Sequence, residues 1–134
     1  MVEGLRIMSF GVLFDFTGNS NVSKVIKTAD LVKESWFLDA VNYKQPIDLF
    51  VVIGHNPIRP SASSSTFGTL YKTIRSTRPE IPIQGFGGHS HVRDFVVFDE
   101  MSTGLESGKV HLIRVNFGGG YRARLQHGSL PSPD

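Results

Sequence analysis

The chain has 134 residues, of which 40% are hydrophobic and 19% charged, with 14 Gly, 7 Pro and no Cys. This length corresponds to one domain at most, and the lack of Cys excludes disulfide bonds and thiolate metal sites. The net charge of +2 is unevenly distributed, because residues 1–108 sum to −1 and residues 109–134 sum to +3, so a broad basic face for nucleic acid is excluded from the first 108 residues.

The first half of the chain predicts two strands and a helix. Residues 5–16 predict a strand, because their apolar side chains first alternate and then run almost continuously. Thr28 is a plausible helix N-cap, and apolar residues recur at helical spacing from there to about Asn42. Residues 47–53 are almost wholly apolar, which is typical of a central strand buried on both faces.

The second half predicts a further helix and two further strands. Residues 67–77 predict a helix with Leu70, Tyr71 and Ile74 on one face, and residues 81–86 and 95–98 predict strands. Strands that alternate with helices indicate the α/β class. Residues 109–134 give no core pattern, and we expect them to be poorly ordered.

Histidines follow two of the predicted strands. His55 lies in Gly-His-Asn-Pro at residues 54–57, and His89 and His91 lie in Gly-Gly-His-Ser-His at residues 87–91. Ligands of α/β sheets bind beyond the carboxyl ends of strands, and residues i and i+2 of an extended chain point the same way, so His89 and His91 could face one centre. The alternative for a single His at a strand end is an ordinary polar loop residue. Neutral imidazole suits Zn, Mn, Fe, Co or Ni, and the sequence does not distinguish them.

Three polar residues near these histidines have two interpretations each. Arg93 is a candidate substrate-binding residue, because a planar guanidinium suits phosphate, and solvent exposure or an ion pair is the alternative. For Arg59 the sequence favours exposure or an ion pair with an acid such as Asp94. Asn56 could orient His55 without binding metal itself, although a turn before Pro57 is the favoured interpretation.

The two histidine motifs together carry a resemblance to a known family. Gly-His-Asn-Pro, followed about thirty residues later by Gly-Gly-His-Ser-His, resembles the calcineurin-like metallophosphoesterases, in particular the branch with secreted 5'-nucleotidases. Residues 10–19, 48–55 and 87–95 are similar to fungal 5'-nucleotidase-like phosphoesterases. The resemblance implies an α/β fold that is part of a four-layer α/β/β/α metallophosphoesterase sandwich. Residues 1–108 would be the C-terminal half of the catalytic domain, and residues 109–134 a divergent tail.

The resemblance also implies a site with two divalent metal ions, with Mn, Zn, Fe and Co not distinguishable. His55 and His89 match ligands of the second metal, and His91 matches a ligand of the first. The expected substrate is a phosphate-ester small molecule, possibly a nucleotide. The family's Asp-x-His and Gly-Asn-His motifs, which supply the bridging carboxylate and the catalytic His, have no match in this sequence, so no catalytic residue is assigned.

The expected function is therefore that of a metal-dependent phosphoesterase fragment that carries half of an active site, and whether the chain is an enzyme stays open. The alternative is a catalytically inactive, truncated or mispredicted chain with at most a partner-binding role. In the fragment hypothesis, the missing half would normally cover apolar strand surface.

The expected partners and location are less specific. We expect no nucleic-acid partner and no membrane span, and the sequence does not determine the oligomeric state. Residues 1–6 predict no signal peptide. Family relatives suggest a secreted or vacuolar parent protein. Because these two observations point in different directions, the location stays unknown.

Overall fold

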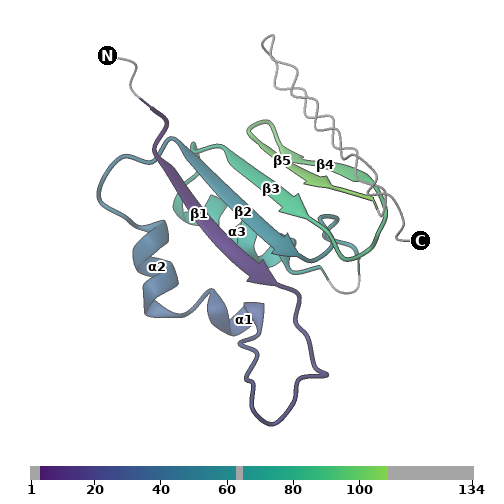
Figure 1. The fold of residues 1–134 in the computed structure, drawn as a ribbon. Helices are drawn as coiled ribbons and strands as arrows, with labels where there is room; N and C mark the ends of the chain where they lie inside the picture. The colour runs from purple at the N-terminus through teal and green to yellow at the C-terminus, as the bar shows by residue number, and fades with distance from the viewer. Residues whose placement is uncertain (1–3, 63–64, 109–134) are drawn as a thin grey trace, which may run out of the picture.

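The computed structural model describes residues 4–62 and 65–108. They form a five-stranded sheet with helices packed behind it (Figure 1). The predicted α/β class is confirmed. The expected divergent tail, residues 109–134, lies outside the described residues. The strands, in their order across the sheet, are β1 (Ile7–Leu13), β2 (Leu49–His55), β3 (Ile83–Gly87), β5 (Ser102–Glu106) and β4 (Asp94–Asp99).

Parallel pairing orders most of the sheet. β1 pairs with β2, β2 with β3 and β3 with β5, all in parallel, whereas β4 returns antiparallel to β5 as a hairpin. The sequence predicted every strand except β5, because Ser-Thr-Gly-Leu-Glu has few of the β-branched and aromatic residues that favour strands. The carboxyl ends of β1, β2, β3 and β5 therefore lie at one edge of the sheet.

The helices are α1 (Thr28–Leu31), α2 (Ser35–Val41) and α3 (Phe67–Thr77). The predicted bounds of α3 are confirmed, but the single helix expected over residues 28–42 is wrong. Glu34 has an extended backbone (φ −64°, ψ 137°), so the chain leaves α1 and begins α2 after a turn. Thr28 is not an N-cap, because its own N–H and hydroxyl donate to Asp15 at 2.8 and 2.9 Å.

The hydrophobic core lies between the helices and one face of the sheet. Phe10 of β1 packs against Phe37 of α2, with ring centroids 4.8 Å apart, and stacks at 6.3 Å on Phe50 of β2. The apolar face of α3 covers the same side of the sheet. The fully buried members of this core are Phe37, Val41, Phe50, Ile58, Leu70 and Ile74.

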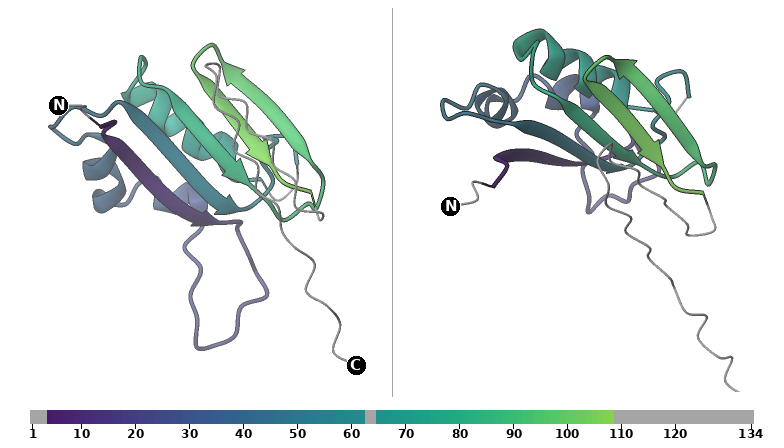
Figure 2. Two further views of the ribbon diagram at one scale, coloured as in Figure 1. Left: turned by 45° about the horizontal axis from the view of Figure 1, so that its top comes forward. Right: turned by 90° about the horizontal axis from the view of Figure 1, so that it is seen from above.

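The opposite face of the sheet is open in the described part of the chain (Figure 2). The expectation that residues 47–53 are buried on both faces is therefore wrong, since Ile53 leaves 55% of its surface exposed. The strand register aligns one row of residues across all five strands, namely Gly11, Ile53, Phe86, Leu105 and Phe95. Ile7, Leu13, Phe95 and Val97 on this face are also 49–61% exposed. Within residues 4–62 and 65–108, no second layer covers this partly apolar sheet face.

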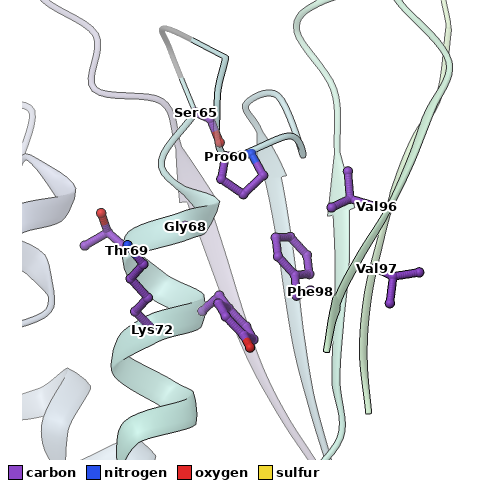
Figure 3. A pocket seen from close by; sticks show the side chains of 9 residues that line it. Pro60, Ser65, Gly68, Thr69, Lys72, Val96, Val97 and Phe98 are labelled. Carbon is purple, nitrogen blue, oxygen red and sulfur yellow. The ribbon is translucent and has the colours of Figure 1, made fainter. Parts of the chain in front are cut away.

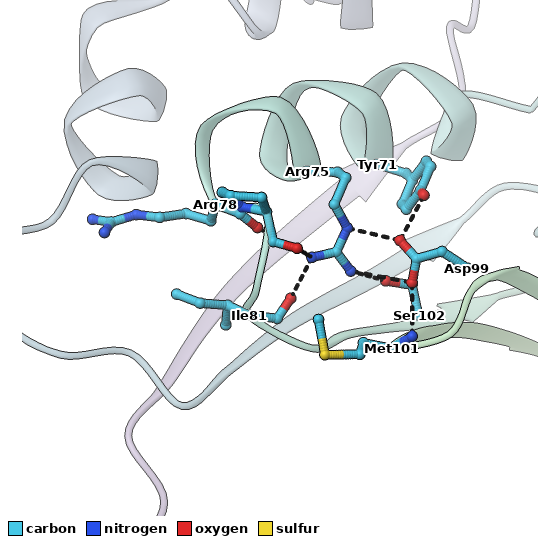
Figure 4. A network of polar contacts seen from close by, with 8 residues as sticks. Tyr71, Arg75, Arg78, Ile81, Asp99, Met101 and Ser102 are labelled. Carbon is cyan, nitrogen blue, oxygen red and sulfur yellow. Dashed lines mark hydrogen bonds and ion pairs between the residues drawn. The ribbon is translucent and has the colours of Figure 1, made fainter.

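A polar network fixes α3 to the β4–β5 hairpin (Figure 4). Arg75 donates to Asp99 at 2.7 Å and to the carbonyl of Ile81 at 2.9 Å, and it also contacts the Ser102 hydroxyl. Tyr71 donates to the same carboxylate at 2.7 Å. Burial alone would raise the pKa of Asp99, but the hydrogen bonds that its carboxylate accepts lower the pKa to about 2.

No helix in the described part of the chain has the length and apolar character that crossing a bilayer requires.

The two faces of the sheet should respond differently to truncation. We expect Phe50→Ala to lower the free energy of unfolding by about 3–5 kcal/mol, because it leaves a cavity in the core. Phe95→Ala on the open face should cost less than about 1 kcal/mol, since that ring is already half in water. Urea unfolding followed by circular dichroism measures both changes. Equal costs would contradict an open face.

The Asp99 network should make the fold sensitive to acid. Because the pKa of Asp99 is lower in the folded chain than its ordinary value of 3.8, its contribution is complete above about pH 4 and is lost as the pH falls toward 2. We expect Asp99→Asn to flatten this loss and to lower stability at pH 7 by about 1–3 kcal/mol. Thermal unfolding between pH 2 and 7 tests it. Arg6 also lowers the pKa of Asp48 to about 2, so Asp48 titrates in the same pH range. Comparing the parent chain with the Asp99→Asn variant separates the contribution of Asp99 from that of Asp48.

Candidate functional site

Two of the predicted metal ligands meet at the carboxyl edge of the sheet. His55 is the last residue of β2, and His89 lies two residues beyond the end of β3. Their imidazoles form an edge-to-face pair with centroids 4.9 Å apart, and Nδ1 of His89 lies 3.1 Å from Nε2 of His55. Phe14, which follows β1, packs on His89 at a centroid distance of 4.2 Å. Three neighbouring strand ends thus build one aromatic cluster.

The spacing of the two ring nitrogens suits a shared metal ion. A nitrogen ligand lies about 2.0–2.1 Å from such an ion, so two adjacent ligands stand roughly 2.8–3.0 Å apart in octahedral geometry and roughly 3.3–3.4 Å apart in tetrahedral geometry. The observed separation of 3.1 Å lies between these two ideal values. The same distance also permits an N–H···N hydrogen bond between neutral tautomers. Within residues 4–62 and 65–108, no third His, Asp or Glu joins the pair to complete a metal-binding group.

The loop that carries His89 is not extended, contrary to the expectation for residues 87–91. His89 and His91 have φ angles of 78° and 60°, a left-handed conformation that non-glycine residues adopt rarely. The argument that residues i and i+2 point the same way therefore fails here, because it holds only for extended backbone. His91 is exposed, and its assignment as a ligand stays a prediction.

Asn56 connects the two histidine-bearing segments through its backbone and side chain. Its carbonyl accepts a hydrogen bond from Gly88 N–H at 2.9 Å, and its side-chain amide donates to the Thr66 hydroxyl at 2.6 Å. The residue is fully buried. The expected turn is thus present, and within the described chain no hydrogen bond joins the Asn56 side chain to the ring of His55. Asn56 holds the turn after β2 rather than the imidazole directly.

Glu106 is a residue of this site that the sequence analysis missed. It ends β5, is only 4% exposed and lies beneath both loops. Its Oε2 accepts from Ile58 N–H at 2.9 Å, and its Oε1 accepts from Ser90 N–H at 3.2 Å and from the Ser90 hydroxyl. In the sequence, Glu106 is a single acidic residue in a segment that was not predicted to be a strand. Nothing in the sequence therefore indicated that its side chain is buried beside the histidine loops.

The two arginines behave differently. Arg59 forms a bidentate ion pair with Asp94, with nitrogen–oxygen distances of 2.8 and 2.6 Å, as the sequence analysis favoured. The hydrogen bonds from Arg59 hold the pKa of Asp94 below its ordinary value. Arg93 is exposed and forms no ion pair with another described residue. Its role as a phosphate contact stays a prediction.

A separate groove lies between α3 and β4 (Figure 3). Pro60, Gly68, Lys72 and Phe98 are among the residues that line it. None of the predicted site residues contributes to its lining, so the histidine pair and this groove are distinct features of the described structure.

Comparisons with known proteins identify relatives of this chain. A 107-residue alignment gives 63% identity to a protein of Arthroderma benhamiae named "Secreted protein" and 40% identity to an uncharacterized protein of Schizosaccharomyces pombe. Each alignment covers 80% of this chain but only 16% and 17% of the respective relatives. No family model matches the chain.

The fold also resembles that of a solved structure. The crystal structure of 5'-nucleotidase from Candida albicans SC5314 superposes with a TM-score of 0.72 at 42% sequence identity, over 81% of this chain and 19% of that one. The mixed α/β fold with a five-stranded sheet is therefore like a segment of a fungal 5'-nucleotidase. The chain spans less than a fifth of the length of each of these proteins.

Glycine at position 87 should be essential for the close approach of the two loops. A Cβ there would lie 2.8 Å from the carbonyl oxygen of Asn56 and 3.0 Å from the nitrogen of Ile58, both backbone atoms. We expect Gly87→Ala to lower the free energy of unfolding by about 1–3 kcal/mol. Gly11→Ala is the matched control, because a Cβ at that strand position meets nothing within 4 Å. Chemical denaturation measures both, and equal stability of the two variants would contradict the crowding at Gly87.

Proposed function

We propose that residues 5–108 form part of the active site of a metal-dependent, 5'-nucleotidase-like phosphoesterase, in which His55 and His89 bind one divalent metal ion. The observation that carries the proposal is the convergence of the two imidazole nitrogens to 3.1 Å at the carboxyl edge of the sheet. The fold similarity to the Candida albicans 5'-nucleotidase supports the reaction class. The proposed substrate is a phosphate ester, with a nucleoside monophosphate as one candidate.

Each residue has a defined part in this proposal. His55 and His89 bind through neutral ring nitrogens, and Phe14 packs on His89 and shields one side of that ring from water. A bound divalent ion supplies the activation of water and the clamping of phosphoryl oxygens. Arg93 is exposed beside the start of β4, and its proposed part is to contact the phosphate of a substrate. His91 is proposed to bind the other ion of the pair, the one that the family resemblance numbers as the first metal.

The described residues provide only some of the ligands that such a site needs. Two imidazoles carry no negative charge, whereas a pair of divalent ions requires carboxylates for compensation. Within the described chain no third acidic or histidine ligand joins His55 and His89. The proposal therefore requires ligands from outside these residues, and the much greater length of the relatives is consistent with that requirement.

The open sheet face fits the same proposal. A sheet face with exposed apolar side chains on several strands, here Ile53, Phe95 and Val97 among others, is typical of a surface that packs against another layer of protein. We propose that a second sheet, bearing the remaining ligands, covers this face. The name of the Arthroderma benhamiae relative also supports a secreted location for the assembled enzyme.

An inactive chain is the competing function. The observation that favours it is the lack of a complete metal-binding group in residues 4–62 and 65–108. A chain of this kind would use the open sheet face to bind a partner and would not hydrolyse phosphate esters. Metal binding by the histidine pair separates the two possibilities, because a partner-binding role needs no affinity for a metal ion.

The decisive experiment is a Co²⁺ and Mn²⁺ titration of the purified chain by calorimetry, with Co²⁺ absorption as a second readout. We expect saturable binding that His55→Ala and His89→Ala each weaken by at least about tenfold, because each removes one of two ligands. His91→Ala should leave this first event unchanged. Lys33→Ala, at an exposed position on the turn after α1, is the control.

Activity is measured in parallel on a generic phosphomonoester and on AMP. A folded parent chain that binds neither metal, or binds it equally well in both His→Ala variants, would contradict the proposed metal site. Hydrolysis that both variants abolish would show in addition that the missing ligands are replaced, for example across a dimer.

A further inference from the structure

We propose that Glu106 is the positioning residue of the His55–His89 pair, holding the two loops so that both imidazoles reach the same point. The part of the inference that concerns metal affinity rests on the proposed function. The part that concerns the positions of the two imidazoles rests only on the contacts of Glu106. The carboxylate does not contact either imidazole, so its effect is exerted through the backbone of both loops.

The carboxylate of Glu106 bridges two segments that are otherwise distant along the chain. One oxygen accepts the N–H of Ile58, in the turn that directly follows His55 and Asn56. The other accepts the N–H and the hydroxyl of Ser90, the residue next to His89. At 4% exposure this carboxylate has little water to replace those partners. Loss of the carboxylate would therefore leave the Ile58 N–H and the Ser90 hydroxyl without this acceptor.

The backbone of His89 shows why such an anchor is needed. Its φ of 78° is unfavourable for a residue with a Cβ, and such a conformation persists only where neighbouring contacts fix it. Three contacts fix it: the Gly88 N–H donates to the Asn56 carbonyl, the Ser90 N–H donates to the Gly88 carbonyl at 3.0 Å and so closes a tight turn around His89, and Ser90 donates to Glu106. Glu106 thus supplies one of the three contacts that hold the strained residue.

Position 106 requires a carboxylate, because hydrogen-bond donors from both loops point at both of its oxygens. A glutamine at position 106 has one oxygen and one NH₂ group, so it can satisfy Ile58 or Ser90 but would present a donor to the other. Glu106→Gln therefore tests the role of the carboxylate with almost no change in volume. Ser90→Ala is the milder variant, since it removes the hydroxyl but keeps the Ser90 N–H that Glu106 binds.

The first measurement needs no metal. Long-range ¹H–¹⁵N spectra of the imidazoles report the tautomers of His55 and His89 in the full chain. We expect one fixed set of ring signals in the parent, averaged or multiple signals in Glu106→Gln and a smaller change in Ser90→Ala. Asp99→Asn is the matched control, because it removes a hydrogen-bonded carboxylate at the opposite end of the same hairpin. Its ring signals should match those of the parent.

The second measurement is Co²⁺ affinity of the same four proteins, alongside their melting temperatures. We expect Glu106→Gln to weaken binding by about 10- to 100-fold, and Asp99→Asn to lower the melting temperature without a comparable loss of affinity. Unchanged ring signals and affinity in a folded Glu106→Gln variant would overturn the inference, as would an Asp99→Asn variant that loses affinity equally.

The two proposals fail in different ways. If the parent chain does not bind Co²⁺, the proposed function fails, and the imidazole spectra alone then decide whether Glu106 positions the pair.

Discussion

The parallel pairing of β2 with β3 is the constraint on which the candidate site depends. Because both strands run in the same direction, residues 34 positions apart in sequence, His55 and His89, leave the sheet at the same edge. The register then brings the Asn56 carbonyl within 2.9 Å of Gly88 N–H. That approach leaves no space for a side chain at residue 87. The chemistry of the imidazole pair is thus a consequence of strand direction and of one close backbone crossing.

Polar groups stabilise the two ends of the β4–β5 hairpin in different ways. At the turn end, Arg75 and Tyr71 converge on Asp99 and fix the hairpin to α3. At the open end, Glu106 receives hydrogen bonds from the loops that carry the histidines. The turn end of the hairpin therefore holds α3 against the sheet. The open end holds the loops at the edge of the sheet where ligands are expected to bind.

The sequence was sufficient for the elements whose pattern is local. The apolar periodicity of α3 and the continuous apolar run of β2 were both found, and the histidines were placed at strand ends correctly. Much of what failed depends on distant contacts. The hydrogen bonds from Thr28 to Asp15 and the bridge made by Glu106 join residues that no short window contains. The break at Glu34 is local, but the apolar spacing continues across it and so predicted one helix. The left-handed backbone at His89 and His91 was missed because a glycine pair suggested a bend without fixing which residue adopts positive φ.

The open apolar face has a consequence for how the chain behaves in a cell. Chaperones and proteases recognise exposed apolar surface as a sign of unfinished folding. A sheet with Ile53, Phe95 and Val97 more than half exposed presents that sign even when every helix and strand has formed. If the proposed second sheet covers this face, the abundance of the polypeptide will depend on how quickly that layer binds as well as on the stability of its core. Its lifetime would then rise with the concentration of the covering protein.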